Sequence, residues 1–440
     1  MRAALPRVVL YAVIILAPLG LIAFLGSPAE SPIYQTGRHF ALVGFMILCL
    51  QGFLAGRIKW AERPFGLDIL VRYHRYMALL GLLLLAAHPV LLAGGGAGWR
   101  LLFGLKLPWY IWLGKAALVA LVIQVVVSIW QGKLGLKFEQ WRIGHDSLAV
   151  FVVAAAFAHS GFAGHDLEKI AWLRALWVGA LAVTLLFLVY HRFLRPRVLG
   201  RRPYGVKEVR READRVWTVV MEPPPGDAVP DYLPGQFQFI TFHRGRGLPE
   251  EEHHWTISSS PTRKTEISST IKELGDFTGT IRHTRPGDTA TVHGPFGRFS
   301  YCLHPEDTDL VFIAAGIGIT PVMSMLRHMR DSGSTLPVLL IYANKRQDDI
   351  VFRDEIDEIE KGGRPSLRAV HVLSRPSEGW TGETGRVDRE KIERFCEGRL
   401  EGRSFYLCGP PGLVKATLEN LRAMGVSDRR MRVEIFSFLD

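Results

Sequence analysis

Six long apolar stretches, all within the first 194 residues, constrain the fold of this chain more than any other feature. They cover about residues 8–25, 39–56, 73–93, 108–130, 145–163 and 172–194. A helix needs about 20 apolar residues to cross a hydrocarbon core of about 30 Å, so the stretches predict a bundle of six transmembrane helices. The first stretch begins with the charge of a signal peptide, but no clear small-residue cleavage site follows it, and we expect it to be retained.

Basic residues mark every second loop of this half of the chain. Lys and Arg gather after the second, fourth and sixth apolar stretches, whereas the alternate loops SPAESPIYQTG and GGGAG are poor in them. Cytoplasmic loops of membrane proteins carry the excess of Lys and Arg. The pattern predicts a multi-pass protein of the cell (inner) membrane with both termini in the cytoplasm. It also explains much of the net charge of +11, so we expect no nucleic-acid partner.

Four histidines recur at one spacing in the third and fifth stretches. His74 and His88 lie fourteen residues apart, and so do His145 and His159. Fourteen residues are nearly four helical turns, so the members of a pair share one helix face about 21 Å apart along the axis. A single histidine near a helix end is more often a hydrogen-bonded polar residue, but ionisable groups within spans are costly and usually functional. Two facing helices predict axial ligands for two b-type haem irons: His74 with His145, and His88 with His159.

The composition changes after residue 195, where charged residues and Pro or Gly turns become frequent. Alternating apolar runs between about 204 and 300 indicate an antiparallel β-barrel, and strand–helix repeats from about 309 indicate a parallel α/β sheet. We therefore expect a multi-domain membrane protein: a six-helix transmembrane domain at 1–195, a β-barrel domain at 196–305 and an α/β domain at 306–440. The four cysteines form no CxxC motif, which argues against a zinc site, an iron–sulfur cluster or a disulfide framework.

Two segments of the barrel region have the composition of a flavin site. In EEHHWTISS (251–259), an aromatic residue beside a hydroxyl residue could cover a flavin ring and bond its polar edge, and a basic residue two positions earlier could meet a phosphate. In IKELGDFTGTI (271–281), Gly275 and short polar residues could open a helix whose amide groups hold a pyrophosphate. Each segment alone is a weak signal, but their order along the chain predicts FAD.

A nucleotide site is predicted at the ends of two strands of the α/β domain. In AAGIGITP (314–321), Gly316 and Gly318 allow a phosphate close to the backbone at a helix amino end, although the pattern lacks the third glycine of the dinucleotide fingerprint. CGPPG (408–412) ends a later strand, where α/β sheets bind ligands. Together they predict NADPH or NADH. Lys345 and Arg346 follow the second strand and favour NADPH, because they could meet its 2′-phosphate.

With these motifs, the chain resembles a bacterial member of the ferric reductase and NADPH oxidase superfamily over nearly its whole length. RYHRYMALLGLLLLAAHP and WRIGHDSLAVFVVAAAFAHS resemble its haem-binding spans, EEHHWTISS its flavin motif, IKELGDFT its pyrophosphate segment, and GIGITP and CGP its nicotinamide motifs. VEIFSF resembles the segment whose aromatic residue covers the flavin until nicotinamide displaces it. The resemblance implies these cofactor contacts: His253, Trp255, Thr256, Ile271, Lys272, Gly275, Thr278 and Phe436 at FAD, and Gly316, Gly318, Thr320, Pro321, Cys408, Gly409 and Pro410 at NAD(P)H. Catalytic roles are implied for Thr256, Cys408 and Phe436.

The resemblance further implies an enzyme that passes electrons from NAD(P)H through FAD and two haems to an acceptor across the membrane, most readily ferric iron. A superoxide-producing NADPH oxidase and a haem-containing donor for a periplasmic protein are the alternatives.

Superoxide-producing relatives commonly carry a further histidine one turn beyond the outer ligand, where this chain has Leu92. Arg38 could add positive charge on the acceptor side or be an ordinary interfacial residue. His254 replaces the proline of the flavin motif, which leaves the local turn open.

Overall fold

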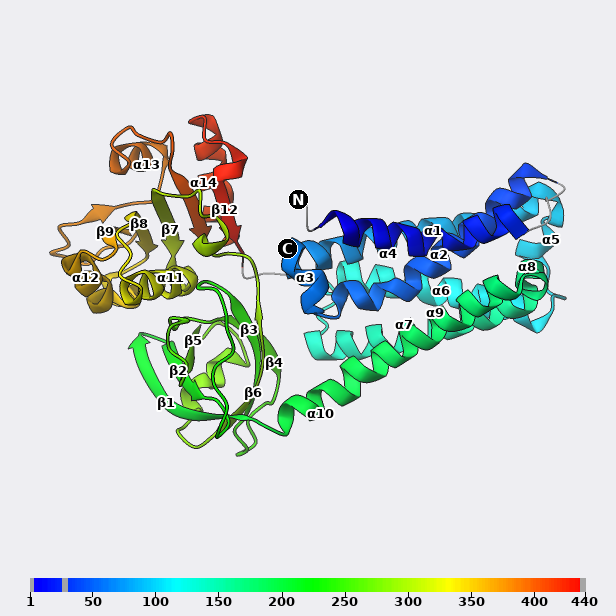
Figure 1. Cartoon of the computed structure of the whole chain (residues 1–440), viewed down its shortest axis with the longest axis horizontal. Coiled ribbons are helices and arrows are strands. Elements are labelled where there is room, and N and C mark those ends of the chain that lie inside the picture. Colours follow the sequence, from blue (N-terminus) through cyan, green and yellow to red (C-terminus); the bar gives the residue numbers. More distant parts are fainter. Residues whose placement is uncertain (1–3, 26–30, 436–440) are drawn as a thin grey trace. The chain divides into compact units, whose positions relative to one another are not determined.

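The computed structural model describes residues 4–25 and 31–435. Contacts divide the chain into two compact units, Met1–Pro196 and Arg197–Asp440 (Figure 1). The first unit is helical, and the second holds two β-sheets with their helices.

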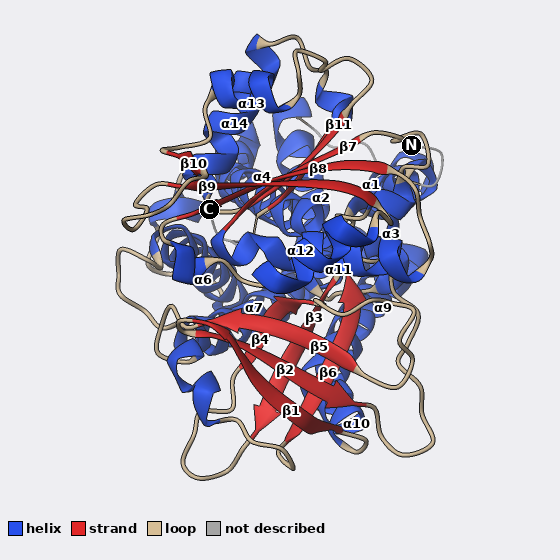
Figure 2. Ribbon diagram, turned by 90° about the vertical axis from the view of Figure 1, so that its left-hand side faces the viewer, coloured by secondary structure: helices blue, strands red, loops and turns tan. Residues whose placement is uncertain are grey.

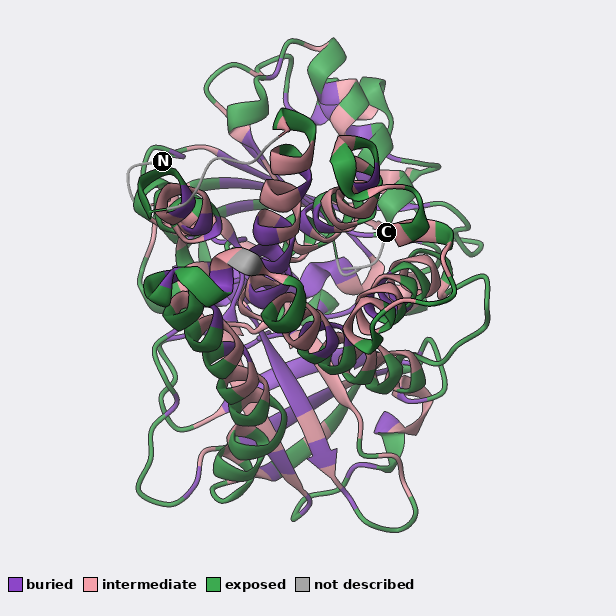
Figure 3. Cartoon of the chain, turned by 90° about the vertical axis from the view of Figure 1, so that its right-hand side faces the viewer, coloured by how far each residue is buried: buried purple, intermediate pink, exposed green. Residues whose placement is uncertain are grey.

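Six helices of the described residues are long and apolar enough to cross a membrane, which confirms the predicted number of spans. Their outward faces carry exposed apolar side chains, such as Leu83 (65% exposed) and Leu186 (69% exposed), as a lipid-facing surface requires (Figure 3). The helical elements are α1 (Leu5–Leu25), α2 (Pro32–Ala55), α3 (Lys59–Phe65), α4 (Leu67–Leu92), η1 (Ala93–Ala97), α5 (Arg100–Phe103), α6 (Trp109–Trp130), α7 (Phe138–Ala163), α8 (His165–Lys169), α9 (Ala171–Val189), η2 (Tyr190–Leu194) and α10 (Arg195–Gly200).

Several helices begin earlier than the apolar stretches that predict them. Helix α2 begins at Pro32 rather than at about 39, because Ser31 accepts a hydrogen bond from the Tyr34 amide at 3.5 Å and proline occupies the first helical position. Helix α7 begins at Phe138 rather than at about 145. Hydropathy marks only the apolar part of a helix, and the polar first turns of α2 and α7 lie outside it.

Glycines let helices α2 and α4 approach each other closely. A Cβ atom at Gly44 would lie 2.7 Å from Leu85 Cγ, and a Cβ atom at Gly81 would lie 3.2 Å from Ile47 Cγ2. Small residues at helix contacts of this kind bring two backbones together in membranes. Helix α6 packs against α7 in a second extensive contact. The histidine-bearing helices α4 and α7 therefore each have a close partner, α2 and α6.

In the second unit, the first sheet is antiparallel and has the strand order β4-β3-β6-β1-β2-β5 (Figure 2). The segment after β4 meets β5 at the other end of this order: the Ser258 amide donates to the Ser268 carbonyl at 2.8 Å. The sheet therefore curls into a barrel, as predicted. Its elements are β1 (Tyr204–Ala213), β2 (Val216–Glu222), β3 (Phe237–His243), β4 (Glu252–Thr256), β5 (Ile267–Lys272), η3 (Thr278–His283), β6 (Thr289–Phe296) and η4 (Tyr301–Leu303).

The second sheet is parallel and has the order β10-β9-β8-β7-β11-β12. Alternate residues of β7 face opposite layers: Phe312 packs in the core of α11 and α12, and Ile313 packs in the core of α13 and α14. This is the predicted α/β arrangement. Its elements are β7 (Leu310–Ala315), η5 (Gly316–Gly318), α11 (Ile319–Asp331), β8 (Pro337–Asn344), η6 (Gln347–Asp349), α12 (Arg353–Gly362), β9 (Ser366–Leu373), β10 (Glu383–Thr384), α13 (Arg389–Phe395), β11 (Ser404–Cys408), α14 (Pro411–Ala423), η7 (Asp428–Arg430) and β12 (Met431–Glu434).

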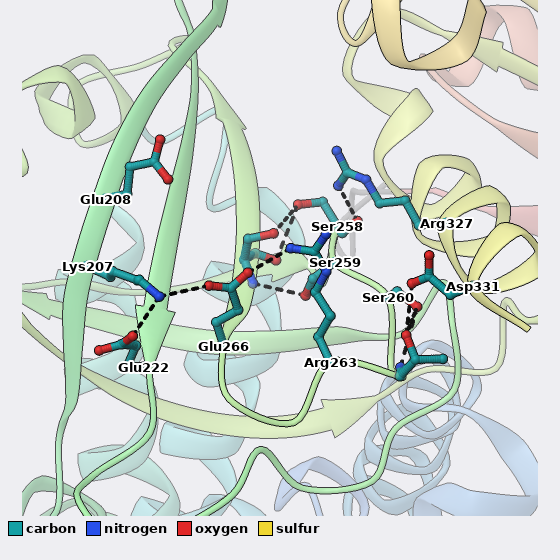
Figure 4. Close-up of polar contacts among 12 residues, drawn as sticks. Lys207, Glu208, Glu222, Ser258, Ser259, Ser260, Arg263, Glu266, Arg327 and Asp331 are labelled. Carbon is teal, nitrogen blue, oxygen red and sulfur yellow. Dashed lines mark hydrogen bonds and ion pairs between the residues drawn. The ribbon is translucent and has the colours of Figure 1, made fainter. Parts of the chain in front are cut away.

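Helix α11 joins the barrel to the parallel sheet through buried polar contacts. Arg327, which is 8% exposed, donates from Nη1 to the Ser258 carbonyl at 2.6 Å (Figure 4). It also pairs through Nε and Nη2 with the two carboxylate oxygens of Glu355. The Ser324 hydroxyl donates to the Ser259 carbonyl at 2.8 Å. These bonds hold the two sheets of the second unit together.

Candidate functional site

The four spaced histidines lie in two uninterrupted helices, His74 and His88 in α4, and His145 and His159 in α7. The rings of His74 and His145, here called the inner pair, have centres 6.2 Å apart. Because a metal–imidazole bond is about 2 Å long, an iron atom between two facing nitrogens requires ring centres about 6 Å apart. The inner pair therefore fits a bis-histidine iron site. His88 and His159 are here called the outer pair.

Three of these histidines use Nδ1 in the same way, against a main-chain carbonyl of the partner helix. The Nδ1–O distances are 3.2 Å from His74 to Gln51, 2.9 Å from His88 to Gly37, and 2.8 Å from His159 to Tyr110. A carbonyl oxygen only accepts, so Nδ1 must carry the hydrogen in each ring and Nε2 keeps its lone pair. That is the state an axial ligand needs, with the second nitrogen oriented by its own hydrogen bond.

His145 differs, because the closest polar partner of its Nδ1 is the Ser128 hydroxyl, 3.2 Å away. Neither Ser128 nor the three carbonyl groups was predicted from the sequence. The sequence does carry a signal for Ser128: Gln124 and Ser128 are polar, four residues apart, and lie in the second half of a span that is otherwise apolar from Ala116 onward.

Gly114 of α6 makes room for His159. A Cβ atom at Gly114 would lie 2.7 Å from His159 Nδ1, inside the contact distance of two such atoms. Since Nδ1 is the atom that donates to Tyr110, a side chain at Gly114 would disturb that bond directly. Gly114 therefore belongs to the site although it offers no polar group.

Arg38 follows Gly37 on α2 and forms an ion pair with Asp166 of α8. The two side chains are 22% and 16% exposed, so Asp166 compensates much of the charge that Arg38 brings to this end of the bundle. Leu92, the last residue of α4, packs on α2: its Cδ2 would lie 3.1 Å from a Cβ atom at Gly37. The position one turn beyond His88 is therefore part of an apolar helix contact.

The two predicted flavin segments meet through aromatic side chains. The Phe277 ring lies 4.2 Å from the His253 ring and 6.0 Å, stacked, from the Trp255 ring, measured between centres. The Arg244 guanidinium lies 5.2 Å from the Phe277 ring centre. The structure thus brings the EEHHWTISS and IKELGDFT segments together, with Phe277 as a contact that the sequence analysis did not single out.

Trp255 and Thr256 point to opposite faces of β4, because successive strand residues alternate. Trp255 packs on the barrel side against Phe242, whereas the His254 ring, on the same face as Thr256, lies 5.8 Å from the Phe239 ring. Strand β4 is at the end of the sheet order, so a planar ring along this edge can reach both faces.

The predicted pyrophosphate helix differs from the expectation. The segment forms a 3-10 helix of six residues, η3, and the Thr278 hydroxyl accepts hydrogen bonds from the amide groups of Leu274 and Gly275, each at 2.9 Å. These two amides are therefore bonded within the turn. Ile271 lies in the barrel core, and Lys272 is partly exposed.

The two nucleotide motifs meet at the carboxyl ends of the neighbouring strands β7 and β11. A Cβ atom at Gly318 would lie 2.3 Å from the Cys408 carbonyl oxygen, so only glycine fits there. Gly316 has φ of +53°. The Tyr342 hydroxyl, a contact that sequence reasoning missed, donates to the Gly316 carbonyl at 3.0 Å and holds this turn from β8.

The other predicted nucleotide residues occupy different environments. Thr320 and Pro321 are buried, and the Thr320 hydroxyl donates to the Ile317 carbonyl at 3.0 Å. Gly409 is buried and Pro410 is exposed, as are Lys345 and Arg346. Phe436 lies outside the described residues.

All four cysteines are free thiols, and three of them are buried: Cys49, Cys396 and Cys408. The Cys408 side chain is fully buried in the core between β7, β11 and α11, and burial raises the pKa of its thiol well above the usual value. Its main chain, rather than its thiol, lies against the Gly318 turn.

A cleft of about 1100 Å³ lies between strands β1, β2 and β5 of the barrel and helices α11 and α12. None of the predicted cofactor residues lines it. Most of its arginines are engaged in ion pairs, such as Arg210 with Glu212. Figure 4 shows another, between Arg263 and Glu266. The cleft is therefore lined mainly by paired charged side chains where the barrel packs against helices α11 and α12.

Comparisons with known proteins match both units. Residues 40–156 match the family described as ferric reductase like transmembrane component, and residues 312–419 match the oxidoreductase NAD-binding domain. The stachydrine N-demethylase reductase subunit Stc4 of Rhizobium meliloti (strain 1021) is 31% identical over 231 residues, which are 51% of this chain and 64% of that protein. The chain thus spans less than two thirds of that relative's length.

Two further likenesses concern the second unit. The sulfhydrogenase 2 subunit gamma of Pyrococcus furiosus is 30% identical over 214 residues, 46% of this chain and 70% of that protein. The cytochrome b5 reductase domain of Ulva prolifera nitrate reductase superposes with a TM-score of 0.47 at 21% identity, covering 53% of this chain and 97% of that domain. With both family matches in one chain, the protein belongs to the oxidoreductases that combine a ferric reductase like transmembrane component with a ferredoxin-reductase-type NAD-binding domain.

Proposed function

We propose that this protein is a transmembrane oxidoreductase that passes electrons from NAD(P)H, through FAD and two b-type haems, to an acceptor on the far side of the membrane. The observation that carries the proposal is the inner pair: two imidazoles with centres 6.2 Å apart, one of them bonded through Nδ1 to a carbonyl. In the outer pair, fourteen residues further along each helix, both histidines donate from Nδ1 to a main-chain carbonyl in the same way.

In this scheme the chain's own residues hold and orient the cofactors. The inner and outer pairs would each offer two imidazole nitrogens to a haem iron. His253, Trp255 and Phe277 form an aromatic surface for a flavin at the edge of β4. The Gly318 turn supplies main-chain groups for the nucleotide. When bound, the flavin takes up a hydride and releases single electrons, and the haem irons carry them onward.

The proposed acceptor is ferric iron in small chelates. Leu92 packs against α2 where an oxygen-reducing site would need a polar group, and Arg38 offers a partly compensated positive charge at the same end of the bundle. We propose that the membrane is the cell membrane and that the second unit lies in the cytoplasm, which follows from the basic loops. A periplasmic protein and oxygen are the competing acceptors.

An absorption spectrum and one variant test the scheme. The purified protein should show two low-spin b-type haems. His88→Ala should leave flavin reduction by NAD(P)H intact and abolish reduction of a membrane-impermeant ferric chelate on the far side of sealed vesicles. Unchanged chelate reduction by His88→Ala would refute the proposal. Cytochrome c reduction that is largely sensitive to superoxide dismutase would identify oxygen, instead of iron, as the acceptor.

A further inference from the structure

The hydrogen bonds of the four histidines follow a repeat that one residue interrupts. On α2, the acceptor carbonyls of Gly37 and Gln51 are fourteen residues apart, which matches the spacing of His88 and His74. On α6, the carbonyl of Tyr110 accepts from His159, so the matching acceptor for His145 is the carbonyl of Gln124, fourteen residues later.

That carbonyl is already occupied. The Ser128 hydroxyl donates to the Gln124 carbonyl at 2.6 Å. His145 Nδ1 lies 3.2 Å from the same hydroxyl oxygen. Ser128 therefore stands between His145 and the carbonyl that the repeat assigns to it.

The single hydrogen of the Ser128 hydroxyl determines which group donates and which accepts in each of these bonds. A serine hydroxyl has one hydrogen and two acceptor positions. Its hydrogen is used on Gln124, and the indole Nε1 of Trp141, which only donates, lies 3.3 Å from the same oxygen. One acceptor position remains for His145, so Nδ1 must be the protonated nitrogen. The Gln124 amide nitrogen lies 3.4 and 3.5 Å from the two ring nitrogens and nearer, at 3.3 Å, to the His145 carbonyl.

We propose that Ser128 is a positioning residue for the inner haem: its hydroxyl relays the hydrogen bond of His145 to the Gln124 carbonyl and so keeps Nε2 turned to the iron with its lone pair free. The inference rests on the proposed function. A hydrogen bond from the far nitrogen of a ligand imidazole increases the basicity of the ligating nitrogen. A more basic ligand favours ferric iron, so Ser128 lowers the reduction potential of the inner haem.

A redox titration of the purified, full-length, haem-loaded protein tests this role. Ser128→Ala should shift the reduction step of one haem to more positive potential and leave the other step in place. Ser128→Thr keeps the hydroxyl and should restore the wild-type titration. The expected change is in a potential and in the low-spin spectrum of one haem, which a purely structural role would not move selectively.

The chain offers a matched control in Ser160. Its hydroxyl donates to the Phe157 carbonyl at 2.8 Å and accepts from Trp177 Nε1 at 2.7 Å, the same arrangement without a histidine nitrogen. Ser160→Ala should therefore leave both haem steps unchanged.

The outcomes separate the two proposals. If the wild-type protein binds no haem, the proposed function fails. If haem binds normally and Ser128→Ala titrates like wild type, or if Ser160→Ala produces the same shift, the role of Ser128 is refuted while the proposed function stands.

Discussion

At the scale of single residues, the site depends on glycines that leave space for other groups. Gly318 allows the Cys408 carbonyl to approach, and Gly114 allows His159 to reach the Tyr110 carbonyl. Neither role is visible in the sequence, because a close approach between distant segments depends on the tertiary structure.

Gly318→Ala should impair nucleotide binding and stability together. The added methyl group would lie 2.3 Å from the Cys408 carbonyl oxygen, so the ends of β7 and β11 must move apart. Such overpacking costs about 1–3 kcal/mol. We expect a raised KM for NAD(P)H and a lower Tm. Gly362→Ala, where a Cβ atom meets open space, is the control and should change the stability by less than about 1 kcal/mol. A wild-type KM and Tm for Gly318→Ala would contradict the packing described here.

Gly114→Ala should affect the outer pair selectively. Its Cβ atom would displace the His159 ring and break the bond to Tyr110, so we expect the haem content of the purified protein to fall toward one haem per chain. A haem assay of the variant checks this result. Gly179→Ala on α9, where nothing lies within 4 Å of an added Cβ atom, should retain the wild-type haem content. Full occupancy in Gly114→Ala would show that His159 does not depend on this space.

At the scale of elements, helices and strands are predicted best from the sequence where a single pattern, such as hydropathy or alternation, determines them. Hydropathy locates all six spans, but α2 and α7 begin earlier because their polar first turns, and at α2 the Ser31 cap, add helix outside the apolar core. Alternating apolar runs predict the barrel, and the repeat of apolar strand and helix predicts the parallel sheet. The 3-10 helix η3 was not predicted, because its short turn is set by the Thr278 hydroxyl. The carbonyl partners of the histidines carry no side-chain signal at all.

Replacing Arg327 should weaken the contact between helix α11 and the barrel and lower the stability of the second unit. Arg327→Met removes the bond to Ser258 and leaves the carboxylate of Glu355, among the residues that the structure describes, paired with Arg330 alone. Breaking a buried ion pair typically costs about 3–5 kcal/mol, and we expect a loss toward the lower end of that range, measured by thermal unfolding. Arg368→Met removes an exposed pair with Glu397 and should cost no more than about 1 kcal/mol. Equal losses in the two variants would argue against a special role for the contact.

The same contact gives a pH dependence with a defined sign. Burial alone would raise the pKa of Glu355, but the hydrogen bonds and charge of Arg327, and the charge of Arg330, outweigh it and hold this pKa below the usual value. Such a carboxyl stabilises the fold above its unfolded pKa of about 4.3 and loses this contribution as the pH falls below it. Glu355→Gln should therefore lower Tm at neutral pH and show a shallower loss of Tm than wild type on acidification. Parallel Tm curves would contradict this assignment.

At the scale of the whole molecule, each unit has hydrophobic cores of its own. The core clusters of the second unit draw only on residues after 197, and those of the first unit only on residues before it. A fragment that begins at about residue 203 should therefore fold alone, unfold cooperatively and, with added FAD, reduce ferricyanide with NAD(P)H. Aggregation of this fragment, or the absence of a cooperative transition, would show that the membrane unit is needed for folding.

The placement of the cysteines has a consequence for the lifetime of such a protein. The proposed release of single electrons to iron or oxygen would generate oxidants, and thiolates are the first targets of oxidants. Cys49, Cys396 and Cys408 are closed off from solvent, and partial burial raises the pKa even of the exposed Cys302, which keeps it in the less reactive thiol form. The fold thus keeps the thiol beside the Gly318 turn out of reach of such oxidants.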